Sequence, residues 1–255
     1  MLDSGFTFID LFCGIGGFHQ AMASIGGRCV FASDIDEACR TVYEKNYGVT
    51  PHGDITVINE KDIPSHNVLC AGFPCQSFSK AGNRLGFSDE TKGTLFFDVL
   101  RILKYHMPEY ALLENVRNLA THDKGNTWRV IRDSLRDIGY NVPDSPTIFS
   151  PHNIGIPQHR ERVFIMCVRK DIGQVPRIEV PDTECSIDSI LLGDDEIDNI
   201  DKYRLTSEQI EYIDNWNEFL QGIKCEKLPG FPIWVDSLCQ LSDNPYYSEF
   251  GTIPK

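Results

Sequence analysis

Short apolar runs alternate with longer helix-like stretches through the first 170 residues of the chain. Buried strands joined by crossover helices have this pattern, which is typical of a mostly parallel α/β sheet. We expect strands at 6–12, 28–32, 68–71, 110–113, 141–149 and 162–168, and helices at 17–25, 36–47, 94–106 and 127–138. The pattern therefore predicts a doubly wound α/β domain.

The alternation stops near residue 171. Residues 176–201 are acidic and loop-like, and the next predicted element is a helix at 206–220, where Thr206 and Gln209 have the spacing of a capping box. We therefore expect a first domain at 1–175 and an acidic C-terminal region at 176–255.

Charge is distributed unevenly between these two regions. The formal net charge is −13, yet residues 1–170 carry 18 Lys and Arg against 19 Asp and Glu, while residues 171–255 carry 6 against 18. The first region is almost neutral and can carry a local basic face, so the acidity does not exclude a nucleic-acid partner. Composition excludes general disorder, and no apolar run approaches the length of a membrane span.

The nine cysteines are scattered, and no two of them have C-x-x-C spacing. A disulfide framework or a zinc ribbon needs closer pairs, so we expect reduced thiols in a cytoplasmic protein and no metal site.

A glycine turn, Gly14-x-Gly16-Gly17, joins the first strand to the first helix. The dinucleotide fingerprint requires a third glycine where this chain has His19, which disfavours a nicotinamide or flavin cofactor. Asp34 follows the second strand, where a carboxylate can accept both ribose hydroxyls. These features indicate a nucleoside without a pyrophosphate, most commonly S-adenosylmethionine; the alternative is a plain glycine turn with a solvated aspartate.

Candidate chemistry follows the third and fourth strands and precedes the last one. Cys75 opens a polar loop after Pro74, where a lowered pKa makes a thiol nucleophilic. Glu114 ends the fourth strand, and Arg160 and Arg162 share one face of the last strand by period-two spacing. Each feature also has a structural interpretation: a buried cysteine, a helix-capping glutamate, or an ordinary ion-pair network.

Four separated motifs together resemble those of the DNA (cytosine-5)-methyltransferases, of which the bacterial restriction–modification enzymes are the closest match. They are Phe8-Ile9-Asp10-Leu11-Phe12-x-Gly14-x-Gly16-Gly17, Gly72-Phe73-Pro74-Cys75-Gln76, Glu114-Asn115-Val116 and Gln158-x-Arg160-x-Arg162. The resemblance covers roughly residues 5–170. It implies a class I S-adenosylmethionine-dependent methyltransferase fold, which is Rossmann-like, and a cytosine flipped out of duplex DNA.

The resemblance also implies catalytic roles. The Cys75 thiolate would attack C6 of the flipped cytosine, and Glu114 would hold N3 and the exocyclic amine. Arg162 would bind the base, and Arg160 would brace the site.

Supporting residues are implied in the same way. Asn115 would orient Pro74 and the loop that carries the nucleophile. S-adenosyl-L-methionine would be the cofactor and S-adenosyl-L-homocysteine the product. The positions implied for cofactor binding are Phe12, Gly14, Gly16, Gly17, Asp34, Ile35, Asp54, Ile55 and Leu95.

The C-terminal region departs from the family pattern. Nothing after residue 220 fits the family's last motif, Gly-Asn-[Ser/Ala]-Val, or offers a basic groove-reading surface. We expect the chain to be a fragment or half of a two-chain enzyme, completed by a C-terminal part or a second polypeptide; a degenerate copy is the third possibility. Competing functions are an RNA cytosine-5 methyltransferase and a non-catalytic DNA-binding subunit.

Overall fold

The computed structural model describes residues 5–74, 95–193 and 196–222. The chain divides into two compact units, one ending at Ile190 and the other beginning at Leu191. The predicted functional boundary at 175/176 stays a prediction, because a compact unit does not define a functional domain.

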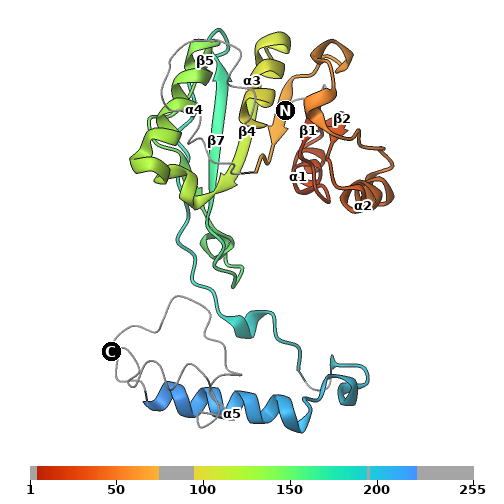
Figure 1. The fold of residues 1–255 in the computed structure, drawn as a ribbon, viewed down its shortest axis with the longest axis vertical. Helices are drawn as coiled ribbons and strands as arrows, with labels where there is room; N and C mark the ends of the chain where they lie inside the picture. Colours follow the sequence, from red (N-terminus) through yellow and green to blue (C-terminus); the bar gives the residue numbers. More distant parts are fainter. Residues whose placement is uncertain (1–4, 75–94, 194–195, 223–255) are drawn as a thin grey trace, which may run out of the picture. The chain divides into compact units, whose positions relative to one another are not determined.

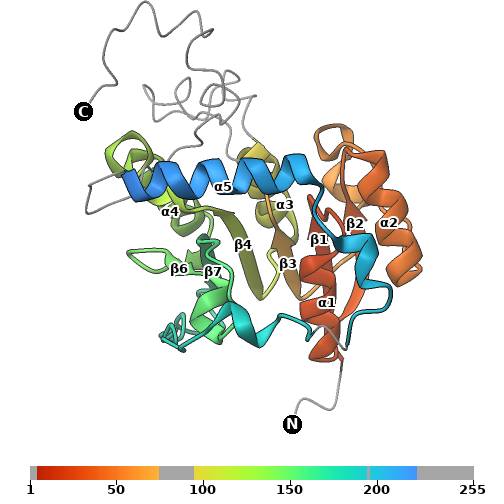
Figure 2. The same cartoon turned by 90° about the horizontal axis from the view of Figure 1, so that it is seen from below.

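The first unit is built on one mixed sheet with helices (Figures 1 and 2). The strands are β1 (Thr7–Leu11), β2 (Arg28–Ser33), β3 (Val68–Ala71), β4 (Tyr110–Val116), β5 (Tyr140–Asn141), β6 (Thr147–Phe149) and β7 (Arg162–Arg169). The helices are α1 (Gly17–Ser24), α2 (Glu37–Tyr47), α3 (Leu95–His106) and α4 (Asn126–Asp137). These bounds confirm the predicted alternation of strands and helices.

The strands lie in the order β2-β1-β3-β4-β7-β5, and β6 also pairs with β7. The β2, β1, β3 and β4 strands are parallel, whereas β7 runs antiparallel to β4, β5 and β6. The carboxyl ends of the four parallel strands therefore meet at one edge of the sheet, where ligands bind in open α/β folds.

Register gives the sheet two chemically different faces. The apolar face carries Ile9, Leu11, Leu69, Ala71, Ala111 and Leu113, which belong to one core cluster with side chains of α3 and α4. The other face, here the polar face, carries Asp10, Cys70, Leu112 and Glu114 at the alternating positions. Phe8 on that side contacts His19 of α1, and Asp10 contacts Tyr43 of α2. The two helix pairs therefore cover opposite faces of the sheet.

Three predicted boundaries differ from the structure. The β4 strand continues to Val116, so Glu114 lies inside it and is held by pairing with β7. The β7 strand begins at Arg162, so Arg160 lies in the loop before it and not in the strand as predicted, although the charges of both arginines act on Glu114. The predicted 141–149 strand is interrupted, and Pro143 and Pro146 stand between β5 and β6, where prolines remove ladder donors.

The second unit contains helix α5 (Ser207–Gly222). The Thr206 backbone amide donates to Gln209 Oε1 at 2.9 Å, and the Gln209 amide donates to Thr206 Oγ1 at 3.2 Å. This reciprocal pair confirms the predicted capping box.

Candidate active site

The glycine turn after β1 is held by the neighbouring strand. The Gly14 amide donates to Asp34 Oδ2 at 2.8 Å, and the Cys13 amide donates to the Ser33 carbonyl at 3.0 Å. Gly14 and Gly16 have φ values of 53° and 98°, a region that disfavours other residues. The turn is thus tied to the loop after β2.

The loop after β2 presents Asp34 and Ile35 together. The Asp36 amide donates to Asp34 Oδ1 at 2.9 Å, so each carboxylate oxygen accepts one backbone amide. Arg40 binds the carbonyls of Asp34 and Ile35, both at 2.9 Å, and Ile35 is 75% exposed. Sequence reasoning missed Arg40; the signal is a cation one turn into a helix that follows the predicted ribose-binding acid.

The remaining predicted cofactor residues lie in different environments. Asp54 accepts from the Thr56 amide at 2.9 Å and caps a short 3-10 helix. Ile55 is 3% exposed within the core cluster, so only its backbone can face a ligand. Leu95 is half-buried at the start of α3, and Phe12 is half-buried with a φ of 56°.

Glu114 and Arg162 form an ion pair at the same edge of the sheet, where β4 pairs with β7. Arg162 Nε lies 3.0 Å from Glu114 Oε1, and their side chains are 23% and 26% exposed. Burial raises the pKa of Glu114, while the positive charges of Arg162 and Arg160 oppose that shift. The carboxyl group is therefore held where a proton can be kept or shared.

Arg160 reaches this area from the loop before β7. Its backbone amide donates to Ser150 Oγ at 2.9 Å, and Ser150 is 2% exposed. Ser150 also forms a reciprocal capping pair with Asn153. Sequence reasoning missed Ser150, although Ser-Pro-x-Asn before the arginines is a recognisable capping pattern.

Asn115 anchors the backbone that leads into the predicted catalytic loop. Its side-chain amide donates to the Phe73 carbonyl at 2.7 Å, and Asn115 is 2% exposed. Pro74, the next residue, is exposed. Cys75, the predicted nucleophile, lies outside the described residues.

Gly72 lies between the ion pair and the glycine turn. A Cβ on Gly72 would lie 3.4 Å from Glu114 Oε2 and 3.9 Å from the Phe12 carbonyl oxygen. The structure therefore brings the glycine turn, the strand that precedes Pro74, and Glu114 together at one place.

The edge fits a nucleoside cofactor on three observations. A Cβ on Gly14 or Gly17 would meet no heavy atom within 4 Å, so the space beside the turn is open. Asp34 keeps further lone pairs after binding two amides, enough for ribose hydroxyls. Ile35 offers an exposed apolar surface beside that carboxylate.

In the described ranges, no three His, Cys, Asp or Glu side chains are grouped to hold a metal ion.

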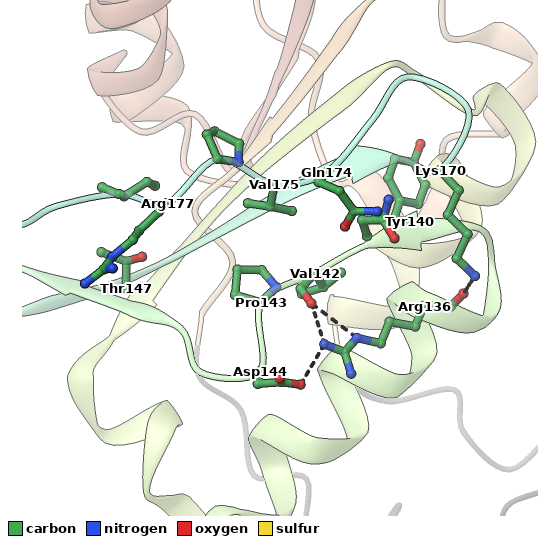
Figure 3. A pocket seen from close by; sticks show the side chains of 13 residues that line it. Arg136, Tyr140, Val142, Pro143, Asp144, Thr147, Lys170, Gln174, Val175 and Arg177 are labelled. Carbon is green, nitrogen blue, oxygen red and sulfur yellow. Dashed lines mark hydrogen bonds and ion pairs between the residues drawn. The ribbon is translucent and has the colours of Figure 1, made fainter.

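A separate cavity of about 610 Å³ lies beside β5 and β6 (Figure 3). Arg136 spans part of its wall, donating to the Val142 carbonyl at 3.2 Å and to Asp144 Oδ1 at 2.9 Å. Its lining, all from described residues, includes none of the predicted site residues.

The described part of the chain contains no helix that is long and apolar enough to span a bilayer.

Curated relatives match most of this chain. The Type II methyltransferase M.HhaI of Haemophilus parahaemolyticus is 41% identical over 215 residues, covering 82% of this chain and 64% of that protein. The Type II methyltransferase M.HpaII of Haemophilus parainfluenzae is 53% identical over 171 residues, covering 66% of this chain and 47% of that protein. The chain thus spans from 47% to 64% of the length of these relatives.

Solved structures agree on the fold. A mutant DNMT2 of Spodoptera frugiperda matches with a TM-score of 0.58 and 22% identity, covering 82% of this chain and 65% of that one. The Dnmt2 methyltransferase of S. pombe matches with a TM-score of 0.50 and 27% identity, covering 64% of this chain and 50% of that one. These likenesses and the mixed sheet show the expected class I methyltransferase fold. The family model of the C-5 cytosine-specific DNA methylases matches residues 6–242, and the chain belongs to that family.

Proposed function

We propose that the chain methylates C5 of a flipped-out cytosine in duplex DNA as part of a bacterial restriction–modification system. The reaction takes its methyl group from S-adenosylmethionine and acts in the cytoplasm, on nucleoid DNA. The observation that carries the proposal is the half-buried Glu114–Arg162 pair, which stands beside Gly72 and the Asn115-anchored entry to Cys75.

The nucleophilic step belongs to Cys75. Its thiolate sulfur forms a bond to C6 of the cytosine, and the electron density moved into the ring makes C5 nucleophilic. After C5 has gained the methyl group, it loses its proton to solvent, and the C6–sulfur bond breaks to return the thiolate. When bound, S-adenosylmethionine would supply the electrophilic methyl group and would leave as S-adenosylhomocysteine.

Glu114 and the arginines manage charge during these steps. A glutamic acid with a raised pKa can protonate N3 and hold the exocyclic amine, which stabilises the electron density that builds up on the ring. When the C6–sulfur bond breaks, N3 returns this proton to the Glu114 carboxylate. Arg162 orients that carboxyl group through its ion pair and contacts the base, while Arg160 adds positive potential. Asn115 holds the Phe73 carbonyl, which fixes the backbone that leads into Pro74.

Cofactor binding is assigned to the glycine turn and the loop after β2. Asp34 would accept the ribose hydroxyls, and Ile35 would pack on the adenine. Asp54 and Leu95 would complete the pocket, with Phe12 along its floor. The proposal includes a completing piece, either a C-terminal part or a second polypeptide, because the sequence after residue 220 lacks the Gly-Asn-[Ser/Ala]-Val motif that the resemblance implies.

The decisive experiment offers tritiated S-adenosylmethionine to the chain, alone and with the C-terminal part of a longer relative supplied separately. Duplex DNA and bulk transfer RNA are compared as acceptors, and Cys75→Ser is compared with Cys185→Ser, an exposed cysteine of the first unit. We expect label in duplex DNA that disappears with Cys75→Ser, persists with Cys185→Ser, and is weak without the completing piece. DNA containing 5-fluorocytosine should trap the covalent adduct.

Three outcomes would contradict the proposal. Label in transfer RNA instead of DNA would indicate the RNA enzyme. DNA binding without adduct or label, even with the completing piece, would indicate a non-catalytic subunit. Undiminished methylation by Cys75→Ser would exclude the covalent mechanism.

A further inference from the structure

The residue that breaks the dinucleotide fingerprint, His19, has a defined place under the glycine turn. It is 8% exposed, and its Nδ1 lies 2.7 Å from the Tyr43 hydroxyl. Its ring stacks on Tyr47, with centroids 3.9 Å apart and planes inclined by 16°. Burial lowers the pKa of His19, so the ring is neutral at physiological pH and packs as an aromatic group. The side chain therefore joins α1 to the end of α2.

Tyr47 carries this contact onward to the turn itself. Its hydroxyl donates to the Gly16 carbonyl at 3.0 Å. A Cβ on Gly16 would lie only 2.1 Å from Tyr47 Cε2, so the tyrosine ring occupies the space beside this buried glycine. Gly16 has a φ of 98°, and its own amide donates to the Cys13 carbonyl at 2.9 Å. Tyr47 thus binds a carbonyl of the turn from the end of α2, and the same carbonyl also accepts from the Gln20 amide of α1 at 3.0 Å.

We propose that Tyr47, stacked on His19, is a positioning residue that fixes the glycine turn for the nucleoside cofactor. This inference rests on the proposed function, because that function supplies the ligand. Glycines lose more conformational freedom on ordering than other residues, so a turn that contains three of them is expensive to order upon binding. A turn that is already ordered binds its ligand more tightly, because less entropy is lost on association.

The test measures S-adenosylhomocysteine binding to the full chain by isothermal titration calorimetry. Tyr47→Phe removes the hydroxyl and keeps the stacked ring, Tyr47→Leu removes both, and Tyr105→Phe removes a hydroxyl from a tyrosine that is 51% exposed on α3. We expect the dissociation constant to rise by roughly 3- to 10-fold for Tyr47→Phe, by more than ~10-fold for Tyr47→Leu, and to stay within about 2-fold for Tyr105→Phe.

Two further readouts separate positioning from plain packing. Amide hydrogen exchange in the peptide that contains residues 13–20 should become faster in Tyr47→Phe without ligand. In the methylation assay, the KM for S-adenosylmethionine should rise while kcat at saturating cofactor and the KM for DNA stay unchanged. If Tyr47 only supported the fold, its substitution would lower Tm but would change neither the affinity for S-adenosylhomocysteine nor the KM for S-adenosylmethionine.

The outcomes distinguish this inference from the proposed function. If the parent chain binds S-adenosylhomocysteine and Tyr47→Phe binds it equally well, the inference is wrong and the proposed function stands. Equal exchange in residues 13–20 would also overturn the inference. If the parent chain binds no cofactor even with the completing piece, the proposed function fails, and the inference fails with it.

Discussion

The apolar and polar faces of one sheet show how the molecule separates stability from chemistry. On the apolar face, Ile9, Leu69 and Leu113 are fully buried against α3 and α4. On the polar face, the neighbouring strand positions carry Asp10 and Glu114, and the helices above them contribute hydroxyl and imidazole groups. Strand alternation alone puts these sets on opposite sides. The apolar face therefore supplies most of the hydrophobic core, while the polar face can carry ionisable groups that are costly to bury.

The largest effect is expected at the exposed end of the polar face. Glu114→Gln keeps the shape but removes the proton that stabilises the cytosine ring, so we expect kcat/KM to fall by ~10²–10⁴. The free energy of unfolding should change by less than about 1 kcal/mol, because the Arg162 pair is partly exposed. Tritium transfer and urea denaturation measure the two quantities. Glu109→Gln, at the residue that precedes the strand, is the control, and equal losses in both variants would contradict the assignment.

The apolar face should respond in the opposite way. Leu103→Ala creates a cavity at a fully buried position of α3, and we expect a loss of about 2–5 kcal/mol in unfolding free energy. Val42→Ala, at a side chain that is 40% exposed on α2, should cost less than about 0.5 kcal/mol. Denaturant titrations of both variants compare them. A Leu103→Ala cost as small as that of Val42→Ala would show that this face is not the main core.

Asp10 should make the polar face sensitive to pH. Burial raises its pKa from 3.8 to about 8, with Tyr43 and the His19 amide opposing the shift and the charge of Asp34 adding to it. Between these two values the folded chain keeps a proton that the unfolded chain has lost. Stability attributable to Asp10 therefore falls as pH rises from about 4 to about 8, by up to ~1.4 kcal/mol per unit, and is level above that.

The Asp10→Asn variant isolates this contribution. Its unfolding free energy, measured from pH 5 to pH 8, should lose the downward slope, so its advantage over the parent grows with pH. Asp62→Asn, at an exposed aspartate, should keep the parent slope. Parallel profiles for the parent and Asp10→Asn would show that Asp10 is ionised in the folded chain.

The smallest effect concerns Ser33, a residue at the end of β2 that pairs in register with Leu11 of the apolar face. Ser33 is 1% exposed, and its Oγ has no hydrogen-bond partner among the described residues. Ser33→Ala removes an unsatisfied polar atom, so we expect stability to stay equal or to rise by up to about 1 kcal/mol. Thermal unfolding can detect this change. A clear loss of stability would reveal a partner for this hydroxyl.

Sequence patterns predicted the strands, the helices and the edge of the sheet where the site lies, because each follows from local periodicity and from glycine positions. The capping box at Thr206 followed from spacing. The meeting of Glu114 and Arg162 depends on the antiparallel pairing of β4 with β7, which the strand patterns did not specify. Arg160 was misplaced, because strand periodicity was extended beyond the point where β7 pairing begins.

Other features depend on packing between elements that are distant in sequence. His19 was interpreted only as a missing glycine, because its contacts with Tyr43 and Tyr47 arise when α1 and α2 share one face. Asn115 and Phe73 are 42 positions apart in the sequence, so no local pattern reports the hydrogen bond between them.

Helix α2 contacts both loops that border the proposed cofactor pocket. Near its beginning, Arg40 donates hydrogen bonds to the backbone after β2, and at its end Tyr47 donates one to the Gly16 carbonyl. The helix therefore supports both loops, in addition to the direct hydrogen bond from the Gly14 amide to Asp34. A tilt of α2 would move the two loops together, so a ligand that displaces one loop would also displace the other through this helix.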